Sequence, residues 1–256
     1  MKAAAQFAYA QARLQARHGQ RPGEQVWRQL EGVGDLANYL HVVRRSPWRH
    51  WVLGMNGSRD SHDTEQLLRS RFRSYVDEVA GWLPPDWKEP IKWVKRLPDL
   101  PALQYLLAGN TAPDWLLKDP MLSNFAIEHR ELRLDAFRQS DCAQLAAAWQ
   151  KGSSLPVAWL EHWQQLLPAN ALKDAGTRHM IKLYRNQLTP SADLTAADTY
   201  HQRYRLETQF KALFRRYSFQ ATAAFAHLGL VALDLEKLRS GLVRRAIFPD
   251  IMKAAS

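Results

Sequence analysis

The chain has 256 residues, which is enough to bury a sizeable core in one or two domains. Its formal net charge of +10, with histidines neutral, favours negatively charged partners: nucleic acid, phospholipid headgroups or acidic protein surfaces. The single cysteine, Cys142, excludes an intramolecular disulfide framework and fits a reducing compartment. No signal-peptide pattern opens the chain, and the longest apolar run is shorter than the ~20 residues of a membrane span. We therefore expect a soluble, cytoplasmic protein.

Helical patterns follow one another along the chain. Apolar residues recur every three or four positions between capping residues, glycines and prolines, and they predict helices at residues 2–18, 22–31, 35–45, 48–53, 61–82, 120–139, 141–150, 156–167, 169–188 and 195–217. Two prolines should divide residues 90–107 into two short helices, and residues 109–119 and 189–193 are predicted to be loops. No segment alternates apolar and polar residues as a strand would. We therefore predict an all-α fold of roughly ten helices, in a single domain over residues 1–256.

Two of these helices carry a clear local signature. The helix over residues 61–82 has an apolar stripe and should point its arginines elsewhere; the stripe is formed by Leu68, Phe72, Tyr75 and Val79, and the arginines are Arg69, Arg71 and Arg73. The helix over residues 120–139 should have Asp119 as its N-cap and Pro120 at its first position.

The C-terminal stretch, residues 219–248, is the most apolar part of the chain, and we expect the other helices to be organised around it. One face is formed by Leu228, Val231, Leu235, Leu238 and Leu242. The first half is apolar nearly all round and should run through the middle of the protein, whereas the second half should turn basic side chains outward, namely Lys237, Arg244 and Arg245. Ser218 is the expected N-cap, and Pro249 ends the pattern.

Motifs of the common catalytic and cofactor sites are missing from the sequence. It contains no glycine-rich phosphate loop, no His-Glu-x-x-His and no cysteine pair for zinc. Glu128, His129 and Glu131 form the densest acid and imidazole cluster, and the arginines beside them favour a solvated salt-bridging face over a metal site. The neighbours of Cys142 favour a buried, inert thiol over a catalytic nucleophile. We expect no cofactor and no metal, and we predict that the protein is not an enzyme.

Polar residues within the C-terminal helix need partners because their surroundings are apolar. For His227 we favour a core histidine with a hydrogen-bond partner over a ligand or a proton relay. Asp234 and Glu236 have Lys237 and Arg239 close by as ion-pair partners. A helical enzyme is the alternative if the fold brings acids or histidines together from different helices.

Tryptophan and arginine are unusually close together in one segment. The chain has ten tryptophans, and five residues within eight positions combine the two types: Arg44, Arg45, Trp48, Arg49 and Trp51. Both types are enriched at protein interfaces, and aromatic residues among basic ones also suit stacking on nucleic-acid bases. The third interpretation is that the indoles fill gaps between helices while the arginines stay solvated. We take these five residues, the Arg-Trp segment, as candidates for partner binding.

Three stretches resemble the family of C-type and d-type central-stalk subunits of V-type and archaeal-type (A-type) rotary ATPases. The opening FAYAQARLQAR is similar to the first helix of the family, with matches at Tyr9, Ala12 and Arg13. In LPDLPALQYLLAG, a second stretch matches at Asp99, Leu103, Leu106 and Leu107, while Ala102 and Gln104 replace the Asn and Lys of the family. The third, ALDLEKLRSGLVRRAI, resembles the final helix, with matches at Asp234, Leu235, Leu238 and Arg239. The order and rough separation of the three stretches also agree with the family.

The resemblance implies a non-catalytic coupling protein built from similar helical bundles around a funnel. Members of this family sit on the cytoplasmic side of the rotor ring, receive the base of the central stalk and pass torque between them in a proton- or sodium-translocating ATPase. The resemblance thus implies ring and stalk subunits as partners and membrane contact through the complex, without a transmembrane segment. A basic helical module that binds nucleic acid or another protein is the alternative, although no recognition motif for nucleic acid occurs.

Overall fold

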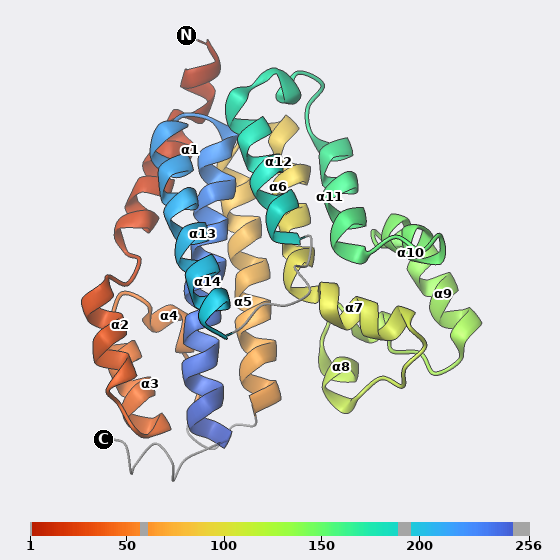
Figure 1. Cartoon of the computed structure of the whole chain (residues 1–256), viewed down its shortest axis with the longest axis horizontal. Coiled ribbons are helices and arrows are strands. Elements are labelled where there is room, and N and C mark those ends of the chain that lie inside the picture. The colour runs from red at the N-terminus through yellow and green to blue at the C-terminus, as the bar shows by residue number, and fades with distance from the viewer. Residues whose placement is uncertain (1, 57–60, 189–195, 248–256) are drawn as a thin grey trace. The chain divides into compact units, whose positions relative to one another are not determined.

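The computed structural model describes residues 2–56, 61–188 and 196–247 (Figure 1). Within these residues every regular element is an α-helix or a 3-10-helix, which confirms the all-α prediction. The chain packs as two compact units, with residues 1–82 and 200–256 in unit 1 and residues 83–199 in unit 2. Unit 1 combines the N-terminal helices with the last two helices of the chain, whereas unit 2 is one continuous stretch.

Unit 1 contains the longest helices of the chain. Its elements are α1 (Lys2–Gly19), α2 (Glu24–Glu31), α3 (Leu36–Arg44), α4 (Arg49–Val52), α5 (Ser61–Trp82), α13 (Ala196–Arg216, from Tyr200 on) and α14 (Ala221–Ile247). α14 packs against α1, α3 and α5 (Figure 1). The predicted stripe of α5 is buried as expected, but Arg73 is buried with it. On α1, Phe7, Ala10 and Leu14 face the core, whereas Tyr9 is exposed.

α14 is the central helix of unit 1, as predicted. Nearly every side chain from Ala221 to Val231 is buried, which confirms that its first half is enclosed on all sides. Phe210 of α13 lies so close to Gly229 that a Cβ atom there would be 2.5 Å from Cζ of its ring. This close approach requires glycine, because a side chain at position 229 would have no space.

The start and the second half of α14 differ from the prediction. Ser218 is not its N-cap: the Ser218 hydroxyl donates to the carbonyl of Arg215 at the end of α13, and Phe219 turns the chain with a φ of 62°. The prediction of Arg245 as an outward residue was also wrong, because its guanidinium donates to backbone carbonyls and is buried. Lys237 and Arg244 are exposed as expected, and Pro249 lies outside the described residues.

Unit 2 consists of shorter α-helices and four 3-10-helices. Its elements are η1 (Pro85–Trp87), α6 (Lys88–Trp93), η2 (Val94–Asp99), α7 (Leu100–Leu107), α8 (Asp114–Lys118), η3 (Ser123–Phe125), α9 (Arg130–Arg138), α10 (Ala143–Gln150), α11 (Leu155–Leu166), η4 (Ala171–Lys173) and α12 (Ala175–Leu188). α11 packs against α6, α7, α10 and α12. Pro98 lies in η2, which separates α6 from α7 and so produces the predicted break.

Four predictions in unit 2 were wrong. The predicted loop over residues 109–119 contains α8, and only α9 of the predicted helix over residues 120–139 forms. Asp119 does not cap a long helix, because its Oδ1 accepts from the N–H of Met121 at 2.9 Å and closes a turn before η3. The predicted helix over residues 169–188 is divided into η4 and α12, since Asp174 accepts from the N–H of Thr177 and starts a new helix. The predicted break at residues 189–193 lies outside the described residues.

The buried guanidinium of Arg133 fixes the irregular segment before α9 to the end of α7. It donates to the carbonyls of Leu106, Asn110 and Ile127, at 2.7 to 2.9 Å. Of these acceptors, Leu106 belongs to α7 and Ile127 lies in the irregular segment before α9, so Arg133 connects the two. The pattern of apolar residues alone could not reveal this set of hydrogen bonds.

Candidate functional site

The structure separates the arginines of the Arg-Trp segment from its tryptophans. Trp48 and Trp51 are 4% and 2% exposed, and their rings contact each other with centroids 5.6 Å apart. Because both indoles are in the core of unit 1, they fill space between helices, which was one of the interpretations of the sequence. Arg44, Arg45 and Arg49 are exposed. Only the arginines of this segment can therefore reach a partner from the folded chain.

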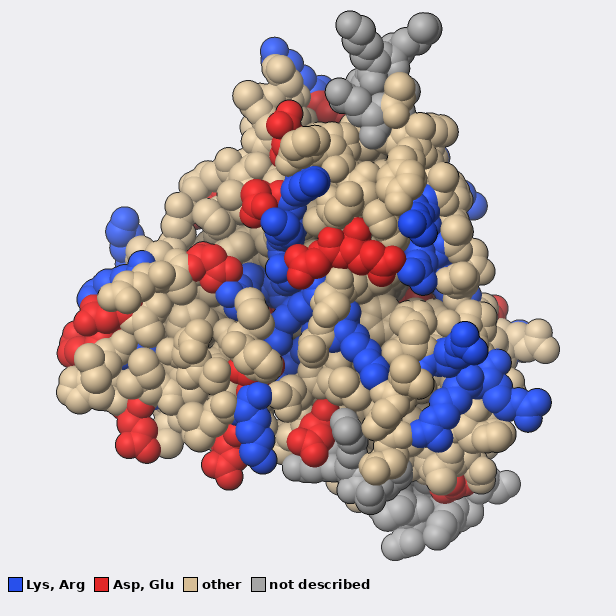
Figure 2. All heavy atoms as spheres, turned by 180° about the vertical axis from the view of Figure 1, so that it is seen from behind, with Lys and Arg blue, Asp and Glu red and all other residues tan. Residues whose placement is uncertain are grey.

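Basic and acidic side chains are unevenly distributed over the surface. Figure 2 shows one face of the molecule on which Lys and Arg lie beside Asp and Glu across the middle. On the right of the same view, a group of basic side chains gathers without acidic side chains between them (Figure 2). Such a group raises the local positive potential, so it favours contact with anionic partners.

A cleft in unit 1 combines charged and aromatic side chains from four helices. We call it the basic cleft. It has a volume of about 300 Å³ and is lined by Trp27, Leu30, Glu31, Tyr39, Arg203, Tyr204, Glu207, Lys237, Ser240, Gly241, Arg244 and Arg245. These residues come from α2, α3, α13 and α14. The lining residues are far apart in the sequence and form no short motif, so the sequence did not predict this site.

Arg245 and Tyr39 form the floor of the basic cleft. The Arg245 guanidinium donates to the carbonyls of Leu30 at 2.9 Å and Val33 at 2.7 Å, and it lies 4.2 Å from the centroid of the Tyr39 ring. The Tyr39 ring fits across α14 because Gly241 has no side chain: a Cβ atom there would overlap the Tyr39 hydroxyl. These contacts fix α14 to α3 and to the end of α2.

Glu207 is the acidic centre of a network on one side of the basic cleft. Its carboxylate forms ion pairs with Lys211 at 2.8 Å, Lys237 at 3.1 Å and Arg21 at 3.6 Å. Burial by itself would raise the pKa of Glu207, but the hydrogen bonds from Lys211 and Lys237 lower it to about 2. Glu207 is therefore ionised at neutral pH, and its charge is balanced by the cations around it.

We had expected Asp234 and Glu236 of α14 to pair with their neighbours in sequence, Lys237 and Arg239. They pair instead with arginines from other parts of unit 1. Arg21, which follows α1, donates to Asp234 at 2.6 Å, Arg203 pairs with Glu236, and Arg239 pairs with Glu65 of α5. Burial raises the pKa of Asp234 to about 6, against the lowering effect of the hydrogen bond from Arg21. The ion pairs thus connect α14 to other helices, whereas pairs within one helix would not.

His227 is a core histidine with a hydrogen-bond partner, which is the interpretation that we favoured. Its Nε2 is hydrogen-bonded to the hydroxyl of Tyr75 on α5 at 2.7 Å. The ring centroids of His18 and Phe214 are 6.2 Å and 6.0 Å from that of His227. Burial lowers the pKa of His227 to about 3, and nearby positive charge adds to the effect; burial also lowers the pKa of His18, to about 4. Both imidazoles are therefore neutral at pH 7.

The residues that carry the family resemblance divide between surface and core. Tyr9 and Arg13 lie on the exposed side of α1, where Arg13 Nε donates to the Tyr9 hydroxyl at 3.1 Å. Ala12 and Arg239 are exposed as well, whereas the remaining positions are buried, namely Asp99, Leu103, Leu106, Leu107, Asp234, Leu235 and Leu238. The Asp99 carboxylate lies 3.5 Å from the guanidinium of Arg96.

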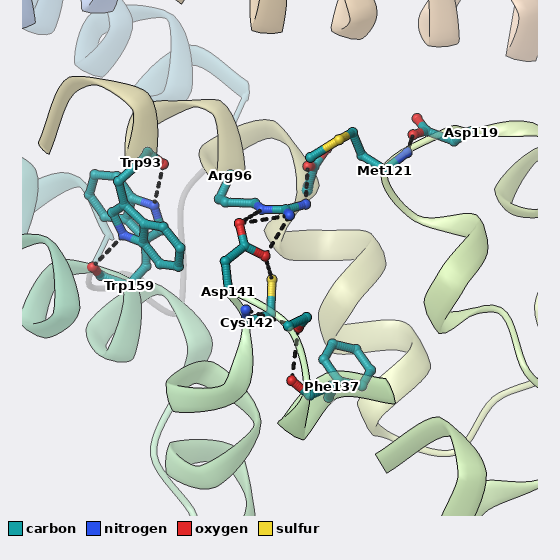
Figure 3. A network of polar contacts seen from close by, with 10 residues as sticks. Trp93, Arg96, Asp119, Met121, Phe137, Asp141, Cys142 and Trp159 are labelled. Carbon is teal, nitrogen blue, oxygen red and sulfur yellow. Dashed lines mark hydrogen bonds and ion pairs between the residues drawn. The ribbon is translucent and has the colours of Figure 1, made fainter. Parts of the chain in front are cut away.

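A polar network in unit 2 surrounds Cys142 (Figure 3). Arg96 donates to both carboxylate oxygens of Asp141, at 2.6 to 3.0 Å, and the Cys142 Sγ lies 3.5 Å from Asp141 Oδ1. Burial raises the pKa of the Cys142 thiol to about 12, although Arg96 acts in the opposite direction. The thiol is thus protonated and inert, as the sequence indicated, and the network is a structural one.

The acid and imidazole cluster of the sequence does not lie on one helix. Glu128 and His129 precede α9 and Glu131 belongs to it, and all three side chains are exposed. Among the described residues, no group of three or more His, Cys, Asp or Glu side chains is arranged to hold a metal ion. In the part of the chain that the structure describes, no helix has the length and apolar character required to cross a membrane.

Comparisons of the chain with the models of known protein families, with curated proteins and with solved structures gave no match.

Proposed function

We propose that the chain is a non-catalytic subunit of a V-type or A-type rotary ATPase that couples the membrane rotor ring to the central stalk. The observation that carries the proposal is the packing of α1 against α14 in unit 1. These helices contain the first and the last of the three stretches that resemble the family of central-stalk subunits. Residues at opposite ends of the chain thus meet in one body, together with α5.

Ion pairs between helices support a role that requires rigidity. Arg17 of α1 pairs with Glu78 of α5 at 2.8 Å, and Arg21 pairs with Asp234 of α14 at 2.6 Å. The second pair is buried, so loss of either partner would leave an uncompensated charge in the core. A protein that transmits torque needs helices that keep their positions under load, and these cross-connections supply that property.

Exposed arginines support contact with an acidic partner surface. Arg44, Arg45 and Arg49 lie at the end of α3 and the start of α4, and all three are exposed. Arginine at the edge of an interface accelerates association with an acidic partner and fixes its orientation. In the proposed complex, these side chains contact the stalk or the ring.

The experiment is an affinity pull-down of the tagged chain from gently solubilised source membranes. Bound proteins are identified by mass spectrometry, and nucleic acid is measured in the same eluate. We expect rotor-ring and stalk subunits in stoichiometric amounts, and less of them with the triple variant Arg44→Glu/Arg45→Glu/Arg49→Glu. Arg138→Glu in unit 2 is the control for the change of charge, since Arg138 is an exposed arginine on α9.

The alternative is a basic helical module that binds nucleic acid. The net charge of +10 and the group of basic side chains in Figure 2 favour it. It predicts nucleic acid in the eluate without ATPase subunits, and an affinity that falls steeply as salt is added. That result would overturn the coupling role.

A further inference from the structure

The basic cleft has a surplus of positive charge. Its lining contains four cationic side chains, Arg203, Lys237, Arg244 and Arg245, and two acidic ones, Glu31 and Glu207. Glu207 is already surrounded by three cations, so it does little to repel an anion that enters the cleft. Arg203 also pairs with Glu236. When all the paired groups are counted, six cations, including Arg21 and Lys211, face four acidic side chains, including Asp234 and Glu236, and this net charge of +2 complements an anionic ligand.

Aromatic side chains line the cleft beside these cations. Tyr204 of α13 is 65% exposed, so its ring is accessible from solvent. Trp27 of α2 is half-buried, and Lys237 Nζ lies 5.7 Å from the centroid of its ring. Because an ammonium group already occupies this position over the indole, Trp27 is poorly placed to stack on a base. Tyr204 instead offers its exposed ring to an apolar side chain.

The spacing of the cations indicates a linear ligand. Lys237 and Arg244 are seven residues apart on α14, which places them two helical turns or about 10 Å apart along the axis. Arg203 contributes a third cation from α13. A phosphate group concentrates its charge at one point and would reach only one of these positions. A peptide with several carboxylates presents its charge along a line and can reach all three.

We infer that the basic cleft binds an acidic segment of a partner protein. Carboxylates of the segment contact Arg203, Lys237 and Arg244, and one apolar side chain of the segment packs on the exposed ring of Tyr204. A cleft of about 300 Å³ is at the lower end of ligand pockets, so it accepts such a side chain and not a whole domain. The cleft would bind such a segment whether or not the chain works in a rotary ATPase.

The test is selection of peptides from a phage-displayed random library on the immobilised full chain. Peptides of about 16 residues are long enough to cover the cleft even if they bind as helices. We expect the selected peptides to be enriched in Asp and Glu together with Leu, Phe or Trp. Synthetic copies should bind the double variant Arg203→Glu/Arg244→Glu at least about tenfold more weakly, measured by fluorescence anisotropy.

Two further variants separate the cleft from the general charge of the chain. Arg138→Glu in unit 2 reverses an exposed charge outside the cleft and should leave the affinity unchanged, whereas Tyr204→Ala should weaken binding without a change of charge. Arg203 and Arg244 are exposed, so we expect the double variant to keep the fold, and thermal unfolding verifies this. Equal binding by the double variant, or selected peptides without acidic residues, would refute the inference. The inference would also be refuted if the double variant lost binding of a single-stranded oligonucleotide but still bound the peptides.

Discussion

His227 shows how one buried group couples stability to pH. Its pKa is lowered to about 3 in the folded chain, whereas an unfolded chain has the ordinary value of 6.5. As the pH falls below 6.5, the unfolded state binds a proton that the folded state does not, so the free energy of unfolding decreases until the pH reaches about 3. The contribution of one such group is at most about 1.4 kcal/mol per pH unit.

We predict that His227→Gln reduces this dependence between pH 6.5 and 3. The glutamine amide retains a partner for Tyr75 but does not titrate. Asp234 affects the pH dependence of stability in the opposite direction, because its pKa is raised and its contribution to stability is lost as the pH rises from 3.8 to about 6. Asp234 is present in both proteins, so its effect cancels in the comparison. Urea unfolding at several pH values measures the slopes. His129→Gln, at an exposed position, is the control, and an identical slope in wild type and His227→Gln would refute the prediction.

Arg245 stabilises unit 1 through contacts that only a guanidinium can make. It donates to the carbonyls of Leu30, Val33 and Gly241, and it covers the Tyr39 ring. Arg245→Met keeps the apolar stem but leaves these buried carbonyls without their donor, so we expect a loss of about 2–4 kcal/mol in the free energy of unfolding. Arg244→Met, at the exposed neighbouring position, should change it by less than about 0.5 kcal/mol. Chemical denaturation of both variants distinguishes the two effects.

At the scale of helices, the crossing of α13 and α14 requires a residue without a side chain at position 229. In Gly229→Ala, the new methyl group would meet the Phe210 ring at 2.5 Å, so we expect destabilisation by about 1–3 kcal/mol. Gly81→Ala on α5 is the matched control, because no atom lies within 4 Å of the added Cβ. Helix propensity should make that variant more stable by up to about 1 kcal/mol. Equal effects of the two substitutions would show that Phe210 does not set the crossing.

Helices with a continuous apolar stripe could be predicted from sequence, whereas the contacts between them could not. The bounds of α5 follow from its stripe and from the prolines after Trp82, and the buried half of α14 follows from its composition. Arg245 and Leu30 are 215 residues apart in sequence, and no local period relates them. The same limit applies to the site. The basic cleft draws on four helices, and the Arg-Trp segment attracted attention because its residues are adjacent, although its indoles are in the core.

At the scale of the whole molecule, each unit has its own core and its own specific contact between two helices. In unit 2, Trp93 Nε1 donates to the carbonyl of Trp159 at 3.1 Å, and Trp159 Nε1 donates to that of Trp93 at 3.3 Å (Figure 3). This reciprocal pair joins α6 to α11. In unit 1, the close contact of Gly229 with Phe210 likewise joins α14 to α13. A substitution that disrupts either contact should therefore first lower the local stability of the unit that contains it.

We predict that Trp159→Phe lowers hydrogen-exchange protection in α6 and α11 while α5 and α14 keep theirs. The substitution removes one indole donor and leaves the buried carbonyl of Trp93 without its partner, which costs about 1–3 kcal/mol. Gly229→Ala should have the reverse effect, with loss of protection in α13 and α14 and none in α11. Amide exchange followed by mass spectrometry resolves the helices of both units in one experiment. If each substitution lowered protection equally in all helices, the two units would unfold as one cooperative body, since local opening in one would then require global unfolding of the chain.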